Sequence, residues 1–319
     1  MNIIESIREK DKTAFSFEIL PPIKGKGTKA LFETVEKLSA FNPKYINITT
    51  HRSEYIYKAQ SDSSYKRERI QRRPGTIGVA AALQNRFGFP TVPHLLCSGY
   101  SVYDTEQILL DLQYLGIDNI LILRGDKAPD ARSFQAEKDG FAHAIDLQKY
   151  VNIYNNGFFA DGAKMDNNDG APFYYGVACY PEKHSESPNL AQDIHWFKEK
   201  VKNGASYGVT QLFYDNQKYF DFVKQCRAEG IDVPIIPGIK PLTKIKQLVA
   251  LPRVFGIDIP DEFVRKLVNA KTDKEVEKVG IDWCVKQCQE LIEFGVPSIH
   301  FYSMGQANDV CEVAEQIYK

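Results

Sequence analysis

A glutamate and an aspartate are the candidates for acid–base chemistry in this sequence. Glu18 lies within FSFEILPP, where apolar neighbours exclude water from a carboxylate and raise its pKa, as a general acid near neutral pH requires. Asp126 closes the run ILILRGD and is the second candidate. Each has a structural alternative. In the first alternative, Glu18 has no catalytic role and is held in an ion pair, although no basic residue adjoins it in that run. In the second, Asp126 forms an ion pair with Arg124 in a loop.

Further polar residues stand where other apolar runs end. His94, His184 and Asp126 have the composition of a metal site with two histidines and one carboxylate, but no HxH or HExxH spacing supports it, so no metal is expected. Lys240 follows PIIPGI and suits a Schiff-base lyase or aldolase, because that chemistry needs a desolvated lysine. The whole set comprises Thr49, Thr50, His51, His94, Arg124, Gly125, Tyr180, Glu182, His184, Gln211, Asp215, Lys240 and Ser303.

Short apolar runs alternate with longer amphipathic stretches along the chain, which is typical of repeated βα units. Runs such as NILIL are continuously apolar and indicate strands covered on both faces, as in a parallel sheet. Eight units predict a (β/α)8 TIM barrel, whose reacting groups sit at the carboxyl ends of the strands. An open doubly wound sheet is the alternative, but residues 21–27 carry no GxGxxG pattern. The predicted strands are residues 14–20, 45–50, 91–97, 119–124, 174–180, 208–214, 234–239 and 298–303.

Two stretches depart from the minimal barrel. Residues 243–294 contain three apolar-periodic pieces separated at Pro252, Pro260 and Thr272, so additional helices are expected before the last strand. Residues 155–171 are rich in Gly, Asn and Asp and are predicted to form a surface loop. No linker divides the sequence, and residues 1–319 are expected to form one barrel domain.

Composition excludes several classes of function. The 319 residues are 43% hydrophobic and 25% charged, with a formal net charge of -1 and no basic stripe, so nucleic acid is not an expected partner. The sequence has no run of eighteen apolar residues and its start is charged, so we expect a cytoplasmic protein without a membrane partner. Six scattered cysteines without CxxC spacing are expected to be reduced and mostly buried.

Taken together, the strand-end residues make the sequence resemble the methylenetetrahydrofolate reductase family, catalytic barrel only. Eight ordered blocks carry this resemblance, from residue 15 to nearly the end of the chain, and any one alone would be weak. The blocks are FSFEILPP (15–22), INITTH (46–51), PHLLC (93–97), LRGD (123–126), ACYPEKH (178–184), KVKNGASYGVTQLFYD (200–215), PIIPGIKP (234–241) and HFYSMG (300–305).

The resemblance implies a flavoenzyme. FAD would accept a hydride from NADH or NADPH, with NADH favoured by analogy, and pass it to 5,10-methylenetetrahydrofolate in a ping-pong reaction that supplies methionine synthesis. Glu18 matches the general acid that opens the imidazolidine ring to an iminium cation. Asp126 matches the carboxylate beside the flavin, whose charge favours that cation. Gln211 matches an amide that contacts the pterin, so the folate site would contain Glu18, Asp126 and Gln211.

The flavin site implied by the resemblance draws on most of the blocks. Asp193 and Lys200 are seven residues apart on one predicted helix and would face the same part of a ligand. The resemblance also implies a homo-oligomer, either a dimer or a tetramer, and the regulatory domain of animal members is not expected. The implied flavin-binding residues are Thr49, His94, Arg124, Gly125, Asp126, Ala178, Tyr180, His184, Asp193 and Lys200.

Three positions depart from patterns common in bacterial members. Phe141 stands where a flavin-contacting tyrosine is usual, Leu251 where a substrate-stacking phenylalanine occurs, and Gln306 where some members have an arginine near the folate glutamate tail. These departures concern peripheral contacts and leave the two carboxylates in place. Besides the reductase, two alternatives stay open, which are the lyase centred on Lys240 and a barrel that binds flavin or folate without turnover.

Overall fold

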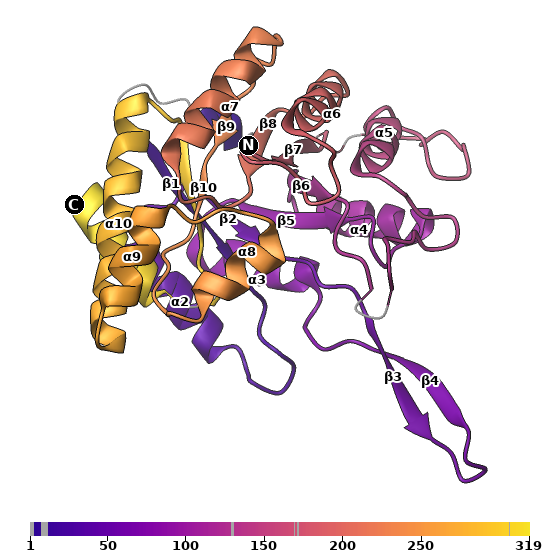
Figure 1. Ribbon diagram of the computed structural model, residues 1–319. Helices are drawn as coiled ribbons and strands as arrows, with labels where there is room; N and C mark the ends of the chain where they lie inside the picture. The colour runs from indigo at the N-terminus through magenta and orange to yellow at the C-terminus, as the bar shows by residue number, and fades with distance from the viewer. Residues whose placement is uncertain (1–2, 8–11, 129–130, 169, 171, 306) are drawn as a thin grey trace.

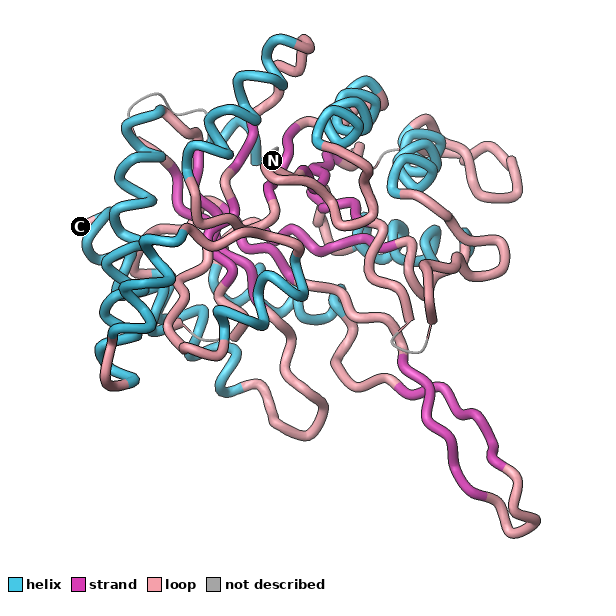
Figure 2. Tube along the Cα trace, in the orientation of Figure 1, coloured by secondary structure: helices cyan, strands magenta, loops and turns pink. Residues whose placement is uncertain are grey.

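A parallel β-barrel forms the centre of the molecule, and helices surround it (Figures 1 and 2). The computed structural model describes residues 3–7, 12–128, 131–168, 170, 172–305 and 307–319. The sheet has the strand order β10-β11-β1-β2-β5-β6-β7-β8-β9, and every pairing in it is parallel. Its strands are β1 (Ala14–Ile19), β2 (Tyr45–Ile48), β5 (Thr91–Leu96), β6 (Asn119–Leu123), β7 (Tyr174–Cys179), β8 (Tyr207–Thr210), β9 (Ile235–Ile236), β10 (Gly238–Ile239) and β11 (Ser298–Tyr302).

The barrel closes at Pro237, which separates β9 from β10. β9 pairs with β8, while β10 pairs with β11, so the two short strands are successive parts of one barrel strand. Proline has no N–H to donate to a neighbouring strand, which accounts for the interruption. Its carbonyl still accepts a hydrogen bond from the His300 amide at 3.0 Å. The predicted eight-stranded (β/α)8 barrel is therefore confirmed, and each predicted range overlaps a barrel strand, although β8 ends at Thr210, four residues before the predicted end.

Helices follow the barrel strands and cover the outside of the sheet (Figure 1). The additional helices predicted before the last strand are present as α8, α9 and α10. Pro260 and Thr272 precede α9 and α10 as predicted, but Pro252 lies inside α8, so the prediction that it separates two pieces is wrong. The helices are α1 (Ile3–Ile7), α2 (Lys29–Ser39), α3 (Thr76–Phe87), α4 (Val102–Tyr114), α5 (Ala144–Asn155), α6 (Leu190–Lys202), α7 (Asn216–Ala228), α8 (Gln247–Phe255), α9 (Asp261–Asn269), α10 (Asp273–Phe294) and α11 (Asn308–Tyr318).

Strand alternation divides the core into two layers. On β1, Phe15, Phe17 and Ile19 face outward and pack in the large cluster that joins the sheet to the helices. Ala14 faces the barrel interior, where it packs with Tyr45 and with α1, whose isoleucines contribute to this inner cluster. The same alternation places Ser16 and Glu18 on the inward face, so Glu18 lies at the carboxyl end of the barrel lumen.

The connection after β2 contains an antiparallel hairpin that was not predicted from the sequence. Its strands are β3 (Glu54–Ala59) and β4 (Tyr65–Ile70), paired from Glu54 with Ile70 to Ala59 with Tyr65. The hairpin extends beyond the helices and away from the barrel (Figures 1 and 2). The alternation EYIYK, the polar turn QSDSS and the sequence YKRERI are the signal that would have predicted it.

The predicted loop of residues 155–171 is present from residue 156, because Asn155 ends α5, and residues 169 and 171 lie outside the described residues. The loop is attached to its neighbours, because the Ala160 amide donates to Glu106 on α4 and the Asn155 side chain bonds Phe173 at both backbone atoms. Five cysteines are buried and Cys311 is partly buried, all as free thiols, as expected. None of the described helices is long and apolar enough to span a membrane.

Candidate active site

Glu18 lies on β1 between two neighbouring strands at the carboxyl end of the barrel. It is level with Asn47 on β2 and with Tyr302 on β11, and its backbone carbonyl accepts a 2.6 Å hydrogen bond from the Ser303 hydroxyl. Its side chain is 15% exposed. Because burial destabilises the carboxylate, the pKa of Glu18 is raised from 4.5 to about 8. The side chain is therefore mostly a neutral acid at pH 7.

His94 on β5 is the ionisable group beside this acid. Its Nε2 atom lies 3.4 Å from Oε2 of Glu18. Burial lowers the pKa of His94 to about 3, with a smaller contribution from His51, so the imidazole is neutral. The two groups are thus a neutral acid next to a neutral base rather than an ion pair, and no lysine or arginine in the described part of the chain forms an ion pair with Glu18. The alternative of an ion-paired strand-end glutamate is not supported.

Two further residues at this level were not predicted from the sequence. Asn47 is fully buried, and both polar atoms of its side chain lack a hydrogen-bond partner among the described residues. A buried amide without partners is energetically costly. Tyr302 donates its hydroxyl to the Thr210 carbonyl at 2.6 Å. An asparagine within the otherwise apolar run YINI was the available signal for Asn47.

Arg124 and Gly125 follow β6 and form a cationic corner of the site. The guanidinium binds both carboxylate oxygens of Glu186, at 2.6 and 2.9 Å, and its carbon lies 4.9 Å from the Phe134 ring centroid. Arg124 thus pairs with Glu186 and not, as the alternative held, with Asp126. Gly125 has φ +80°, and a Cβ there would approach Ser98 Cβ to 2.9 Å, so glycine is required.

Asp126 itself is exposed, and its backbone carbonyl accepts a hydrogen bond from the Ser98 hydroxyl at 3.0 Å. Its carboxylate is therefore available at the rim, while Gly125 fixes the course of the loop that carries it. Thr49 is also on the rim, where its hydroxyl lies 3.3 Å from Nε2 of His51. Gln211 is half-buried after β8, and its Oε1 accepts from the Leu212 amide at 2.9 Å.

The β7–α6 connection holds most of the remaining predicted residues together. Asp193 on α6 accepts hydrogen bonds from the His184 amide and the Ser187 hydroxyl, each at 2.7 Å. Lys200, about two turns further along α6, donates to the Ala178 carbonyl at 3.3 Å, and desolvation lowers the pKa of its ammonium group. The Tyr180 and His184 rings meet edge to face with centroids 4.9 Å apart. Asp193 thus contacts the loop that follows β7, whereas Lys200 contacts the end of strand β7 itself.

Several other candidates lie apart from this arrangement. Lys240 is buried after β10, and its burial lowers the pKa of the amine, which is the property that Schiff-base chemistry requires. His300, which was not a predicted site residue, is on the inward face beside Ser16, whose hydroxyl lies 2.9 Å from its Nδ1, while its Nε2 lacks a partner among the described residues. Phe141 packs against Tyr150, Leu251 is buried near α9, and Gln306 lies outside the described residues.

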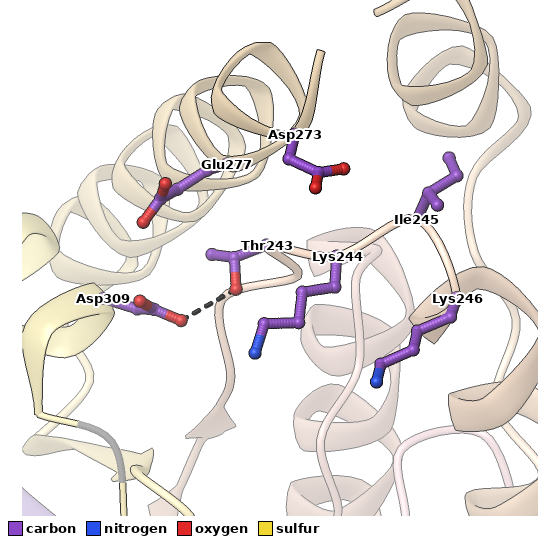
Figure 3. A pocket seen from close by; sticks show the side chains of 7 residues that line it. All are labelled: Thr243, Lys244, Ile245, Lys246, Asp273, Glu277 and Asp309. Carbon is purple, nitrogen blue, oxygen red and sulfur yellow. Dashed lines mark hydrogen bonds between the residues drawn. The ribbon is translucent and has the colours of Figure 1, made fainter.

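Two of the cavities in the described part of the chain lie outside the barrel lumen. The larger, about 470 Å³, is formed by the loop after β10 and the starts of α10 and α11, and a hydrogen bond from Thr243 to Asp309 at 2.8 Å crosses its wall (Figure 3). Its lining includes both lysines and carboxylates: Thr243, Lys244, Ile245, Lys246, Asp273, Glu277 and Asp309. The smaller, about 310 Å³, lies between the start of α7 and α10. No group of three metal-ligating side chains is assembled within the described ranges.

The arrangement fits a flavin dinucleotide on three observations. Arg124, His184 and Lys200 would supply donors for a diphosphate and ribose around β6 and β7. Gly125 removes a side chain where the loop passes close to Ser98. The unpartnered amide of Asn47 and the buried Glu18 lie in the adjoining lumen. A polar ligand at the rim would adjoin the partly exposed Glu18 carboxyl group, whereas Asn47 is fully buried beneath it.

Comparisons with known proteins agree with this geometry. The family model described as methylenetetrahydrofolate reductase matches residues 3–318. Methylenetetrahydrofolate reductase (NADH) 1 of Arabidopsis thaliana is 30% identical over 311 residues, which are 94% of this chain and 48% of that protein. The 5,10-methylenetetrahydrofolate reductase of Escherichia coli is 29% identical over 293 residues, 92% of this chain and 86% of that protein. The chain thus spans about half the length of the eukaryotic relative and most of the bacterial one.

A solved structure shows the same fold. It is a protein from Clostridium thermocellum that binds two copies of 5-methyl-5,6,7,8-tetrahydrofolic acid. The two structures align with a TM-score of 0.57 and 13% sequence identity, over 99% of this chain and 98% of the other. At that identity the likeness concerns the barrel architecture alone.

Proposed function

The chain belongs to the methylenetetrahydrofolate reductase family, and from this premise we propose that it reduces 5,10-methylenetetrahydrofolate to 5-methyltetrahydrofolate. The observation that carries the proposal is the neutral acid Glu18, which is buried in the lumen beside neutral His94. Ring opening of the substrate needs a proton at neutral pH, and an ordinary glutamate with a pKa near 4.5 would already have lost it.

Glu18 is the proton donor in this proposal. It protonates one nitrogen of the imidazolidine ring. The bond between that nitrogen and the bridging carbon then breaks, and the 5-iminium cation forms. Asp126 on the rim stabilises the cation through its negative charge. Gln211 orients the pterin by its side-chain amide. The structural relative that binds a methylated tetrahydrofolate is consistent with a folate in such a barrel.

We propose FAD as the bound cofactor, with NADH or NADPH as the hydride donor. When bound, the flavin supplies hydride transfer between the nicotinamide and the folate. Arg124, His184 and Lys200 hold its diphosphate and ribose, while Thr49, His94, Gly125, Ala178, Tyr180 and Asp193 shape the rest of the site. The name of the Arabidopsis relative favours NADH. The two substrates would use the site in turn, and the product would serve methionine synthesis in the cytoplasm.

Anaerobic spectroscopy of the two half-reactions tests the proposal. Purified protein supplied with FAD should lose its flavin absorbance on addition of NADH or NADPH and regain it on addition of 5,10-methylenetetrahydrofolate. Glu18→Gln should keep the first step and lose the second. A flavin that is never bleached would instead support a binding protein without turnover.

The buried Lys240 keeps one alternative specific enough to test. A lyase would be trapped covalently when borohydride is added together with a carbonyl substrate, because borohydride reduces a Schiff base to a stable amine. Lys240→Met should abolish such trapping. If trapping occurs in a protein that shows neither flavin half-reaction, the lyase replaces the reductase.

A further inference from the structure

The β3–β4 hairpin is an arm that leaves the rim of the barrel. It occupies the connection of residues 49–75 between β2 and α3, where barrel proteins ordinarily have only a short loop. Each strand has six residues, so the arm reaches roughly 20 Å from its root. Figures 1 and 2 show it projecting into solvent, away from the helices. Such a long, ordered connection needs a physical explanation.

The root of the arm is fixed to the barrel. The Lys24 amide donates to the Arg72 carbonyl at 2.8 Å, and the Arg73 guanidinium donates to the Pro21 carbonyl. On the other side, the Thr76 hydroxyl donates to the Thr49 carbonyl at 3.2 Å. The arm is therefore held at a defined place on the rim, and whatever binds it is placed relative to the barrel mouth.

Strand pairing gives the arm two different faces. Directly opposite residues of an antiparallel pair share a face, and successive residues alternate. One face, here called the charged face, contains Glu54, Ile56 and Lys58 opposite Ile70, Glu68 and Lys66. Charges on this face are paired with one another, because the Glu68 carboxylate forms ion pairs with the ammonium groups of Lys58 at 2.5 Å and Lys66 at 3.5 Å.

The other face, here called the aromatic face, contains Tyr55, Tyr57, Ala59, Tyr65 and Arg67. Its tyrosines are 42%, 60% and 70% exposed in chain order. The Arg67 guanidinium carbon lies 3.6 Å from the Tyr55 ring centroid, and Arg67 makes no ion pair with any other described residue. Tyrosine and arginine are, with tryptophan, enriched in the energetic centres of protein interfaces.

Two physical arguments indicate that this face is covered in the functional state. A lone two-stranded hairpin is at best marginally stable in water, so an arm of this length gains order from a partner. The arm also differs in charge from the rest of the chain. Residues 51–73 contain seven basic and three acidic residues, a net charge of +4, whereas the remainder contains 33 basic and 38 acidic residues, a net charge of -5.

We propose that the aromatic face of the β3–β4 arm docks on the body of a second copy of this chain. The arm and the remainder of the chain carry opposite net charges, which favours contact between the arm of one copy and the body of another. Tyr57 and Tyr65 supply apolar contact area there, and Arg67 supplies the charged contact. Because the root is attached to the rim, each arm joins its partner next to the barrel mouth.

Analytical ultracentrifugation of the full chain over a range of concentrations tests this. Wild-type protein should form an oligomer. The double variant Tyr57→Thr with Tyr65→Thr should raise its dissociation constant by about 30-fold or more, since threonine keeps the strand but removes both rings. Arg67→Glu should also dissociate it, and added salt should weaken the wild-type assembly.

The matched control lies on the opposite face of the same strands. Lys58→Arg with Lys66→Arg changes two similarly exposed positions without changing the charge of the arm and should leave the oligomer largely intact, because these side chains point away from the proposed interface. Circular dichroism of each variant verifies the fold. A wild-type monomer at every concentration, an aromatic-face variant that assembles as wild type does, or equal losses from both faces would each overturn the proposal. None of these measurements depends on catalysis.

Discussion

Nε2 of His94 lies 3.4 Å from Oε2 of Glu18, and burial shifts their two pKa values in opposite directions. The pKa of Glu18 rises to about 8 and that of His94 falls to about 3, so both side chains are neutral over several pH units. A carboxylate and an imidazolium at this distance would attract each other, yet the low-dielectric lumen disfavours both charges. The proton therefore stays on the carboxyl group, where a substrate can receive it.

The pH dependence of the folate half-reaction follows from this arrangement. Because Glu18 must be protonated to act, the rate should be high below pH 8 and fall about tenfold per unit well above it. Stopped-flow reoxidation of the reduced flavin by 5,10-methylenetetrahydrofolate measures this rate. The nicotinamide half-reaction, which uses no proton from Glu18, is the internal control and should lack that decline. A folate step that accelerates through pH 8 would contradict the assignment.

The raised pKa of Glu18 also predicts how stability depends on pH. The folded state favours protonated Glu18, so its contribution to stability is complete below pH 4.5 and is lost as pH rises through about 8. Glu18→Gln is permanently neutral, so its free energy of unfolding should increase relative to that of wild type as pH rises. The increase should be about 1.4 kcal/mol for each pH unit between 4.5 and 8.

Urea unfolding of both proteins at about pH 5 and pH 9 measures this difference. Glu199→Gln is the control, because Glu199 is a glutamate on the surface of α6 that pairs with Lys202. It should show no comparable increase with pH. Equal behaviour of the two variants would indicate that Glu18 is not held neutral in the folded protein.

Asp126 should act through its charge rather than through protonation. Asp126→Asn removes a negative charge at the rim, so the iminium cation is less stabilised and the folate half-reaction slows, while the flavin becomes easier to reduce. Potentiometric titration of the bound FAD should give a higher midpoint potential for the variant. An unchanged potential would contradict the electrostatic role, even if the folate step were slower.

The barrel was predictable because its signals are local and repeated. Runs such as NILIL must be covered on both faces, and each of the eight predicted ranges overlaps a barrel strand. Pro252 was misread as a boundary, since proline usually ends a helix, but here it lies within α8 and the Gly256 amide still bonds its carbonyl. The β3–β4 arm was missed because its strands are polar and fit no βα unit.

Side-chain partners were less predictable than strand positions. Glu18 could be selected from its apolar neighbours in sequence, but the proximity of His94 depends on two strands that are not adjacent, since β2 lies between β1 and β5. The side chain of Asn47 lacks hydrogen-bond partners because the lumen encloses it. Glu186 is separated from Arg124 by 62 residues, and no local pattern links them.

The pairing of Arg124 with Glu186 has a measurable consequence for cofactor binding. In the proposed flavin site, Arg124 must turn from this carboxylate to a phosphate, so Glu186 competes with the cofactor for the same guanidinium. Glu186→Gln should therefore tighten FAD binding about two- to fivefold, which is the range expected for a partly exposed ion pair. Quenching of FAD fluorescence on titration with apoprotein measures the affinity without turnover. Glu199→Gln removes a similar surface ion pair on α6 and should not change it. Weaker FAD binding by Glu186→Gln would mean that Glu186 orients Arg124 for the cofactor instead of competing with it.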